Sequence, residues 1–489
     1  LLCNFRNSKN ITGGTHLNAI MRIVPSSWKQ GEPIEKQSLL VQNESELAHH
    51  IETGLINIYS DYTHQTIEGY GCALTESACF LLSQMDDETR KKALGCWFGP
   101  NGIDSSFIRM HLDSCDYSLE EYQAISDPIA DPEFKTFSIA RDLRFTIPIV
   151  LEAIKMANKK VTVLVSPWSP PAQWKTAPEE KENEAKVYGG DSASKSDAAG
   201  RCRGGRLKKE YYKDWANYLV LYLQAYKKAG IPVGMMTIQN ESNAATPWDS
   251  CVWSAHEEMI FLRDYLYPAM QKAGLEKEIG IYVWDHNKER VLEYVDEMMA
   301  GGVADMIEGF AYHWYAGDHY DALTMLHEHY PDKILMRSEG CPLHKPGTDN
   351  ESDTMRYAND LTNEVTHGMN RWIEWNAIVD TEGGPRHVPG GFGAPLVAKS
   401  DGSFEELAGY QVIREFASVI QPGAVRLGSS VYSRDIDAAA AQNPDGSIGV
   451  SIVSYTDASK QIAIRLKGQI CQTTIQGKGL FTVLFTDGQ

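Results

Sequence analysis

Two glutamates with polar neighbours give this sequence its clearest chemical signal. Glu241 closes the β-rich segment PVGMMTIQNE (232–241), and Glu339 lies near the end of a similar segment, KILMRSEG (333–340). Two carboxyl groups can cleave a glycosidic bond, because one acid protonates the leaving oxygen while the other carboxylate attacks or stabilises the anomeric carbon. These residue types therefore indicate glycoside hydrolysis.

Aromatic and hydrogen-bonding side chains stand at the ends of the other β-rich segments. Indole faces can pack on sugar rings, while Asp, Asn and Arg can hydrogen-bond to sugar hydroxyls. The residues of this kind are Arg109, Asp116, Tyr117, Trp168, Trp174, Asn240, Asp285, His313, Trp314, Tyr315, Ser338, Glu374, Trp375 and Asn376. Any one of these residues is more typical of a salt bridge at the rim or of the core. The prediction of glycoside hydrolysis therefore depends on their occurring together at the strand ends.

Eight β-rich segments, alternating with polar or helical stretches, must position these residues. The segments are 65–74, 105–112, 161–169, 232–241, 279–287, 307–315, 333–340 and 371–378. Most begin as continuous apolar runs, which is typical of parallel strands buried on both faces. Helices are predicted over 209–230 and 255–273. This alternation predicts an α/β fold, a (β/α)₈ TIM barrel with its functional residues at the carboxyl ends of the strands.

The pattern changes on both sides of the barrel, which we predict to span 63–406. Residues 407–489 alternate short strands with turns, which predicts an all-β sandwich. Residues 21–62 are expected to add strands to the same sandwich, while residues 1–20 are expected to be extra or unstructured. The long irregular segment 176–206 should emerge on the catalytic face as a lid, a binding loop or a disordered loop.

Composition and charge exclude several classes of function. The 489 residues carry a net charge of −19, and 43% hydrophobic with 23% charged residues is ordinary for a globular protein. Such a charge repels phosphate backbones and anionic lipids, so we expect neither nucleic-acid nor membrane partners. Since residues 1–20 also lack the pattern of a secretory leader, a cytoplasmic protein is expected.

Cysteine and histidine spacing gives no sign of a metal site. The nine cysteines are an odd number without paired spacing, so reduced thiols are expected. Neither a C-x-x-C pair nor an H-E-x-x-H helix occurs, and His313 is expected to be a hydrogen-bonding group. We therefore expect no metal and no cofactor.

Several motifs together resemble glycoside hydrolase family 30, the group that includes glucosylceramidases. They are QTIEGYGCALTESA, IRMHLDSCDYS, SPWSPPAQW, TIQNE (237–241), HWY, SEG (338–340) and EWNAIVDTEGGP. The resemblance covers about residue 55 to the C-terminus and implies a barrel with a side β-sandwich made from both chain ends. It also implies that Glu241 is the acid/base and Glu339 the nucleophile.

The same resemblance implies a sugar-binding subsite lined by Arg109, Asp116, Trp168, Asn240, Tyr315 and Trp375. Asn240 would contact the 2-hydroxyl of the sugar, and Tyr315 would hydrogen-bond to the nucleophile. One departure stands beside the acid/base, where the family commonly has Pro and this chain has Ser242. We expect it to alter the loop at the leaving-group site.

These residues predict a retaining mechanism acting on a β-linked oligosaccharide or glycoside. Arg109 and Tyr315 should favour the Glu339 anion, whose charge should raise the pKa of Glu241. Retention requires a carboxyl separation of about 5–5.5 Å. We favour an exo-acting β-glucosidase similar to glucosylceramidase. The alternatives are a β-xylosidase, a β-1,6-glucanase, an inactive carbohydrate-binding protein and a scaffold protein.

Overall fold

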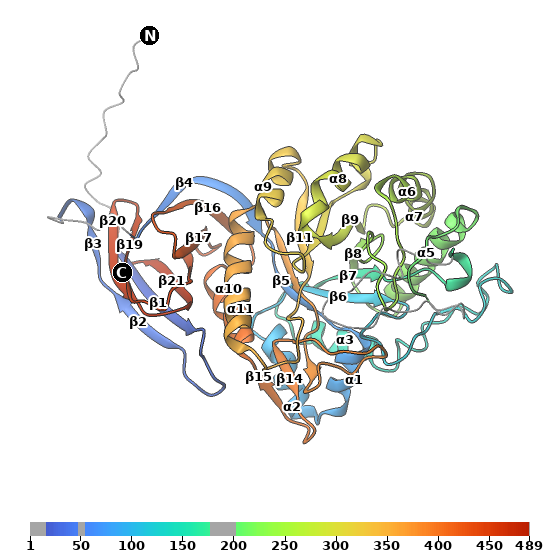
Figure 1. Ribbon diagram of the computed structural model, residues 1–489, viewed down its shortest axis with the longest axis horizontal. Coiled ribbons are helices and arrows are strands. Elements are labelled where there is room, and N and C mark those ends of the chain that lie inside the picture. Colours follow the sequence, from blue (N-terminus) through green and yellow to red (C-terminus); the bar gives the residue numbers. More distant parts are fainter. Residues whose placement is uncertain (1–15, 47–53, 177–201, 489) are drawn as a thin grey trace, which may run out of the picture.

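The computed structural model describes residues 16–46, 54–176 and 202–488. It contains a closed barrel of eight strands and a separate ten-stranded sheet. Helices α10 (Asn350–Thr366) and α11 (Ala408–Val419) pack between the two (Figure 1). The predicted (β/α)₈ TIM barrel with an added β-sandwich is confirmed.

All eight barrel strands are parallel and fall within the eight predicted segments. They are β5 (Gly69–Ala73), β6 (Phe107–Leu112), β7 (Thr162–Pro167), β8 (Val233–Thr237), β9 (Gly280–Asn287), β10 (Gly309–His313), β11 (Ile334–Glu339) and β12 (Arg371–Glu374). Large side chains from these strands, among them Leu164, Met235 and Tyr282, fill the barrel interior. Because the interior is packed, a ligand can approach only at the ends of the strands.

Helices surround the barrel on its outer face. They are α1 (Glu76–Gln84), α2 (Asp87–Phe98), α3 (Thr146–Met156), α5 (Tyr212–Lys228), α6 (Ala255–Phe261), α7 (Tyr267–Ala273), α8 (Val291–Ala300) and α9 (Tyr320–His329). Ser254 and Glu257 form a capping box that starts α6. The helix predicted over 255–273 is interrupted by a π-helical turn at Leu262–Leu266.

The ten-stranded sheet combines both ends of the chain. Its strands are β1 (Leu17–Pro25), β2 (Glu35–Leu39), β3 (Val41–Asn43), β4 (Leu55–Ile67), β16 (Ala424–Val431), β17 (Ile436–Gln442), β18 (Ile448–Ser454), β19 (Lys460–Leu466), β20 (Gln469–Ile475) and β21 (Gly479–Asp487). β1 lies between β2 and β21, and β4 lies between β16 and β19. The sheet folds over its own apolar core, which includes Ile56, Val450 and Phe481.

Two expectations at the edges of the domains were wrong. The strand β1 begins at Leu17, so the end of segment 1–20 belongs to the sheet. Region 407–489 is not all-β, because it opens with helix α11. This helix buries residues at helical spacing, including Val412, Phe416 and Val419, and a 3.6-residue period is incompatible with a strand.

A small sheet extends the barrel face that carries the strand ends. It consists of β13 (Val379–Asp380), β14 (Leu396–Ala398) and β15 (Phe404–Glu406). The chain between β13 and β14 forms a long loop over that face, which starts with a cis peptide bond at Gly384–Pro385. Most of the predicted loop 176–206 lies outside the described residues.

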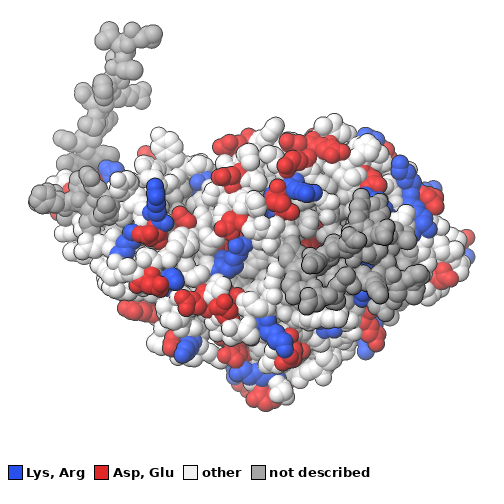
Figure 2. Space-filling model, in the orientation of Figure 1, with Lys and Arg blue, Asp and Glu red and all other residues white. Residues whose placement is uncertain are grey.

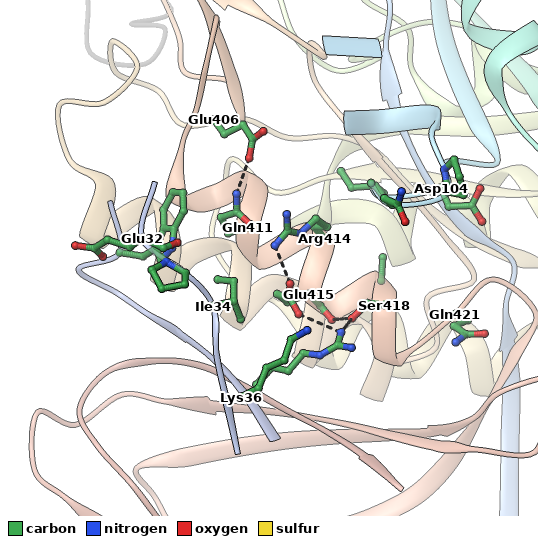
Figure 3. A pocket seen from close by; sticks show the side chains of 18 of the residues that line it. Glu32, Ile34, Lys36, Asp104, Glu406, Gln411, Arg414, Glu415, Ser418 and Gln421 are labelled. Carbon is green, nitrogen blue, oxygen red and sulfur yellow. Dashed lines mark hydrogen bonds and ion pairs between the residues drawn. The ribbon is translucent and has the colours of Figure 1, made fainter. Parts of the chain in front are cut away.

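A polar cleft separates the ten-stranded sheet from the barrel (Figure 3). Its volume is about 920 Å³. Arg22 from β1 donates to Glu415 of α11 at 3.3 Å, and Arg414 donates to the other oxygen of Glu415 at 2.9 Å. Gln411 donates to Glu406 at 2.7 Å. The charged groups of this cleft therefore bind one another.

The surface and the cysteines show few special features. Acidic and basic groups are interspersed on the face shown in Figure 2. The eight cysteines within the described residues are free and buried. No helix in this part of the chain combines the length and apolarity needed to cross a bilayer.

Candidate active site

A small pocket lies at the carboxyl ends of the barrel strands. Its lining residues are Asp116, Trp168, Asn240, Glu241, Trp248, Tyr315, Glu339, Leu343, Trp375 and Phe392. Seven of them are predicted site residues, and the eighth predicted residue, Arg109, contacts this group from below. Folding thus brings all the predicted site residues together.

Arg109 organises the floor of the pocket. This fully buried residue of β6 donates to Glu339 Oε2 at 2.5 Å, to Asn240 Oδ1 at 2.8 Å and to Asp285 Oδ2 at 2.8 Å. The Tyr315 hydroxyl donates to Glu339 Oε1 at 2.9 Å. Both oxygens of Glu339 are therefore held by hydrogen-bond donors, which fixes the carboxylate and favours its ionised form.

Glu241 is held by strained backbone. It has a φ of +53°, and Asp285, which lies near the end of the next strand, β9, has a φ of +45°. The Glu241 amide donates to the Asp285 carbonyl at 2.8 Å, which joins the two strand ends. Side chains other than glycine avoid such φ values unless their surroundings enforce them, and such strain is concentrated at functional sites.

His313 lies between the two glutamates. Its Nδ1 is 3.7 Å from Glu241 Oε1, and its Nε2 is 3.9 Å from Glu339 Oε2 and 3.1 Å from Asp285 Oδ1. A register shift between Tyr312 and His313 re-aims this part of β10. His286 Nδ1 also approaches Glu241 Oε1, at 3.6 Å. Glu241, His286 and His313 have the spacing of metal ligands, but their pairing is that of an ion-pair cluster.

Two tryptophans form an aromatic wall. Trp168 and Trp375 stack with their ring centroids 5.2 Å apart, and the Arg109 guanidinium lies 4.9 Å from the Trp168 centroid. The edge of Tyr117 meets Trp375 at 5.8 Å. These fully buried rings present a rigid apolar surface beside the carboxylates.

Two of the residues predicted at strand ends, Glu374 and Trp174, stabilise the fold and do not line the pocket. Glu374 pairs with Arg337 at 3.4 Å and accepts the Tyr357 hydroxyl at 2.5 Å, in a buried network outside the pocket. Trp174 stacks on Tyr211 within the helical layer. Both have the residue types of the site but point away from it.

Arg386 packs behind the pocket lining, against Asp116, Trp248 and Phe392, and the sequence did not reveal it. Its guanidinium lies 4.8 Å from the Tyr117 ring, 4.6 Å from Phe392 and 3.4 Å from Asp116 Oδ2. All its guanidinium nitrogens are buried, and none has a hydrogen-bond partner among the described residues. Trp248, whose centroid lies 5.6 Å away, was likewise missed. Both residues lie in irregular loops, where no periodicity marks the buried positions.

Ser242 joins the acid/base region to its neighbours. Its hydroxyl donates to the Trp284 carbonyl at 3.0 Å, and its own carbonyl accepts the Trp253 amide at 2.7 Å. Proline at this position would lack the hydroxyl. The departure noted in the sequence therefore changes how the loop after β8 is anchored.

The histidines change the acidity of the two glutamates. Burial raises the pKa of Glu241, but the adjacent rings of His286 and His313 outweigh it and lower the pKa to about 2. Burial also raises the pKa of Glu339, and His313 and Arg109 offset this only in part. Burial lowers the pKa of His313, but Glu339, Asp285 and Glu241 raise it to about 9 overall.

The predicted order of acidities is therefore wrong for this structure. Glu241 was expected to be the weaker acid because of the charge on Glu339. The motifs did not place two histidines beside Glu241, and their effect exceeds that of Glu339. The raised pKa of His313 favours its protonated form at neutral pH.

The matches to known families cover most of the chain. Residues 67–406 match the TIM-barrel domain of glycosyl hydrolase family 30, and residues 423–483 match its beta sandwich domain. The chain belongs to glycosyl hydrolase family 30. The resemblance seen in the sequence is thus confirmed, and this member of family 30 is a retaining O-glycosyl hydrolase.

Similar proteins differ in the substrates that their names give. A putative glucosylceramidase 4 of Caenorhabditis elegans is 26% identical over 91% of this chain and 86% of its own length. An endo-1,6-β-D-glucanase of Trichoderma harzianum is 25% identical over 79% of this chain and 77% of its own. The crystal structure of SrfJ from Salmonella typhimurium has a TM-score of 0.84 and 27% identity, covering 96% of this chain and 99% of SrfJ.

Proposed function

We propose that this family 30 hydrolase is an exo-acting β-glucosidase that removes terminal β-D-glucosyl residues. The observation that carries the proposal is the arrangement of Glu339, held by Arg109 and Tyr315, opposite Glu241 in a small pocket with the Trp168–Trp375 wall. The aromatic wall suits the apolar face of a sugar ring, and the packed barrel interior closes the pocket from below, as an exo-acting enzyme requires.

In the first step, Glu339 attacks the anomeric carbon while the acid form of Glu241 protonates the departing oxygen. This step forms a glycosyl ester on Glu339 and releases the aglycone alcohol. In the second step, the Glu241 carboxylate takes a proton from water, and the water oxygen attacks the anomeric carbon. Glu339 leaves as a carboxylate, so the anomeric configuration is retained.

His313 supplies the proton that Glu241 needs in this scheme. It carries a proton up to about pH 9, and its Nδ1 lies 3.7 Å from Glu241 Oε1. Transfer of that proton leaves a neutral histidine and a protonated Glu241, so the local charge does not change. On these pKa values the transfer is uphill by several kcal/mol, so the protonated form of Glu241 is a minor form of the free enzyme on which the first step draws.

In this proposal glucose is favoured over xylose by Asp116, which lines the pocket, and by Arg386, which pairs with it from behind. Asp116 can accept hydrogen bonds, and the buried guanidinium of Arg386 makes no hydrogen bond to a described residue. A sugar with an additional hydroxymethyl group offers this pair one more partner than xylose does. Buried polar groups that stay unpaired strongly disfavour an analogue that lacks the matching hydroxyl.

Initial rates on matched nitrophenyl β-D-glucoside and β-D-xyloside test the proposal, with the Glu339→Ala protein as blank. We expect the glucoside to be preferred and NMR to show β-glucose as the first product. Preference for the xyloside would transfer the mechanism to a β-xylosidase. Cleavage of internal bonds in β-1,6-glucan without action on the glucoside would replace the exo assignment by an endo-1,6-glucanase.

A further inference from the structure

A second group of chemically active side chains lies outside the pocket, where three loops of the catalytic face meet. Glu121 follows β6, Asp249 follows β8 and His387 follows β13. A carboxylate oxygen of Glu121, a carboxylate oxygen of Asp249 and a ring nitrogen of His387 all lie within 4.8 Å of one another. Asp249 is 2% exposed, while the carboxylate of Glu121 reaches solvent.

The hydrogen bonds of His387 determine which of its ring nitrogens faces the carboxylates of Glu121 and Asp249. Its Nδ1 lies 3.1 Å from the Ser118 carbonyl oxygen, which can only accept, so Nδ1 carries the hydrogen. In neutral histidine the other nitrogen, Nε2, then presents its lone pair. That lone pair is 3.2 Å from Asp249 Oδ2. Neither of these two atoms has a hydrogen-bond partner among the described residues.

Two acceptor atoms at this distance repel each other unless a positive charge lies between or beside them. A metal ion supplies that charge, and so does a second proton on His387. Burial lowers the pKa of His387, but Asp249 raises it overall, so a second proton and a metal ion compete for this position. The contact lies outside hydrogen-bond geometry, which favours the metal.

The separation and surroundings also fit a metal ion. Ligands at about 2.0–2.2 Å from tetrahedral zinc are roughly 3.3 Å apart, close to the 3.2 Å between His387 and Asp249. The ligands have the supporting hydrogen bonds typical of metal sites. Ser114 donates to Asp249 Oδ1 at 2.8 Å, and the Cys202 amide donates to Glu121 Oε1 at 3.3 Å. One nitrogen with two carboxylates suits Zn²⁺ better than Ca²⁺ or Mg²⁺, which prefer oxygen alone.

We propose that Glu121, Asp249 and His387 bind one zinc ion, with a fourth position open to water. The ion would join three loops of the catalytic face. Trp248, which lines the pocket, and Arg386, which packs behind it against Phe392, directly precede two of the ligands in the chain. The metal would therefore fix the pocket wall without taking part in the chemistry. No zinc motif marks it in the sequence, because each ligand comes from a different loop.

Titration of tag-free, chelator-treated protein with Co²⁺ tests this site. We expect one equivalent of Co²⁺ to bind and produce the visible absorption of a four-coordinate ion, which one equivalent of Zn²⁺ abolishes. Zn²⁺ should also raise the Tm. His387→Gln should remove the absorption band, and Glu121→Gln, which alters an exposed ligand and leaves the fold intact, should weaken binding by at least about tenfold.

His344→Gln is the matched control. His344 Nε2 pairs with Asp353 Oδ1 at 3.0 Å, but this pair is not one of the three-residue groups with metal-ligand spacing among the described residues. Its substitution should leave Co²⁺ binding unchanged. Absence of stoichiometric Co²⁺ or Zn²⁺ binding by the wild type would overturn the proposal. The contact between His387 and Asp249 would then be an ion pair with a protonated His387. Binding that persists in both the Glu121 and the His387 variants would overturn it as well.

Discussion

The cleft beside the sandwich and the pocket at the strand ends are both hollow and lined by charged groups, but they differ in how those groups are bonded. The cleft is much the larger of the two. In the cleft, Arg22, Arg414 and Glu415 bind one another. Behind the pocket wall, the buried guanidinium of Arg386 lies 3.4 Å from Asp116 but makes no hydrogen bond to a described residue.

This difference shows that bonding, rather than size, distinguishes a site from a gap between domains. Buried donors without partners are costly, so proteins retain them where a ligand completes them. The positive φ of Glu241 adds to that cost. Asp104 in the lining of the larger cleft also has a positive φ, but none of the buried donors without partners among the described residues lines that cleft.

We expect the largest difference in activity between the pocket and the cleft when one carboxylate in each is replaced by an amide. Glu339→Gln should reduce kcat by roughly 10⁴-fold or more, since the nucleophile is lost. Glu406→Gln in the cleft should stay within about twofold of wild type, as surface substitutions away from a site do. Initial rates of both proteins on the preferred glycoside, with circular dichroism to verify folding, measure the contrast. An equal loss of kcat in both variants would mean that the pocket and the cleft do not differ in function.

Removal of the proposed acid should depend on the substrate. Glu241→Ala should lower kcat by roughly 10²–10⁴-fold on an alkyl glycoside but far less on a dinitrophenyl glycoside, whose leaving group needs little protonation. The ratio of the two rates, compared with that of wild type, is the measurement. A similar loss on both substrates would contradict the assignment of Glu241 as acid/base.

Arginine substitutions sharpen the comparison. Arg386→Met should lower kcat/KM by about 10–100-fold, because each hydrogen bond to a charged group contributes about 1.5–3 kcal/mol. Arg414→Met in the cleft should leave kcat/KM unchanged. Glucoside and xyloside rates of both variants test this pair, and we expect Arg386→Met to reduce the preference for the glucoside. If that preference is unchanged, Arg386 does not contribute to recognition of the sugar.

The pH dependence of stability should also come from the pocket. The pKa of His313, about 9, exceeds the usual value of 6.5, so its stabilisation is complete below pH 6.5 and lost as pH rises through 9. The free energy of unfolding should fall by up to about 3 kcal/mol over this range. His313→Gln should remove this fall in urea titrations at pH 6 and pH 9.5. A fall that persists in the variant would assign it to other groups.

The smallest effect is expected from a single ion pair of the cleft. Arg22, partly exposed, pairs with Glu415 at 3.3 Å. Arg22→Ala should lower the free energy of unfolding by about 1 kcal/mol or less, since solvent screens such a pair. It should not change kcat/KM. Urea unfolding and initial rates on the same preparation check both, and a loss of activity would couple the cleft to the pocket.

The sequence predicted most of the barrel because its strands repeat one pattern. Each is an apolar run that ends in polar residues, and burial on both faces forces that composition. Helix α11 was missed because its flanks alternate like strands, and its buried stripe is evident only once the helical period is tested. Segment Leu17–Ile20 was missed because its partner, β21, lies at the other end of the chain.

The site was predicted where its residues stand at strand ends, and missed where they stand in loops. Glu241 and Glu339 could be found because the barrel fixes where strands end. Arg386, Trp248 and His387 are placed by contacts between loops, and no local period records such contacts. For the same reason the effect of His286 on the acidity of Glu241 required coordinates.

The joining of both chain ends in one sheet constrains the order in which the protein can fold. Leu17 pairs with Asp487, so β1 has no partner on that side until the final strand has left the ribosome. The barrel strands, from Gly69 to Glu374, are synthesised earlier and can assemble without β21. Such a long sequence separation slows pairing and exposes strand edges meanwhile. A nascent chain that stalls before residue 479 would carry an unpaired, aggregation-prone edge although its catalytic domain is complete.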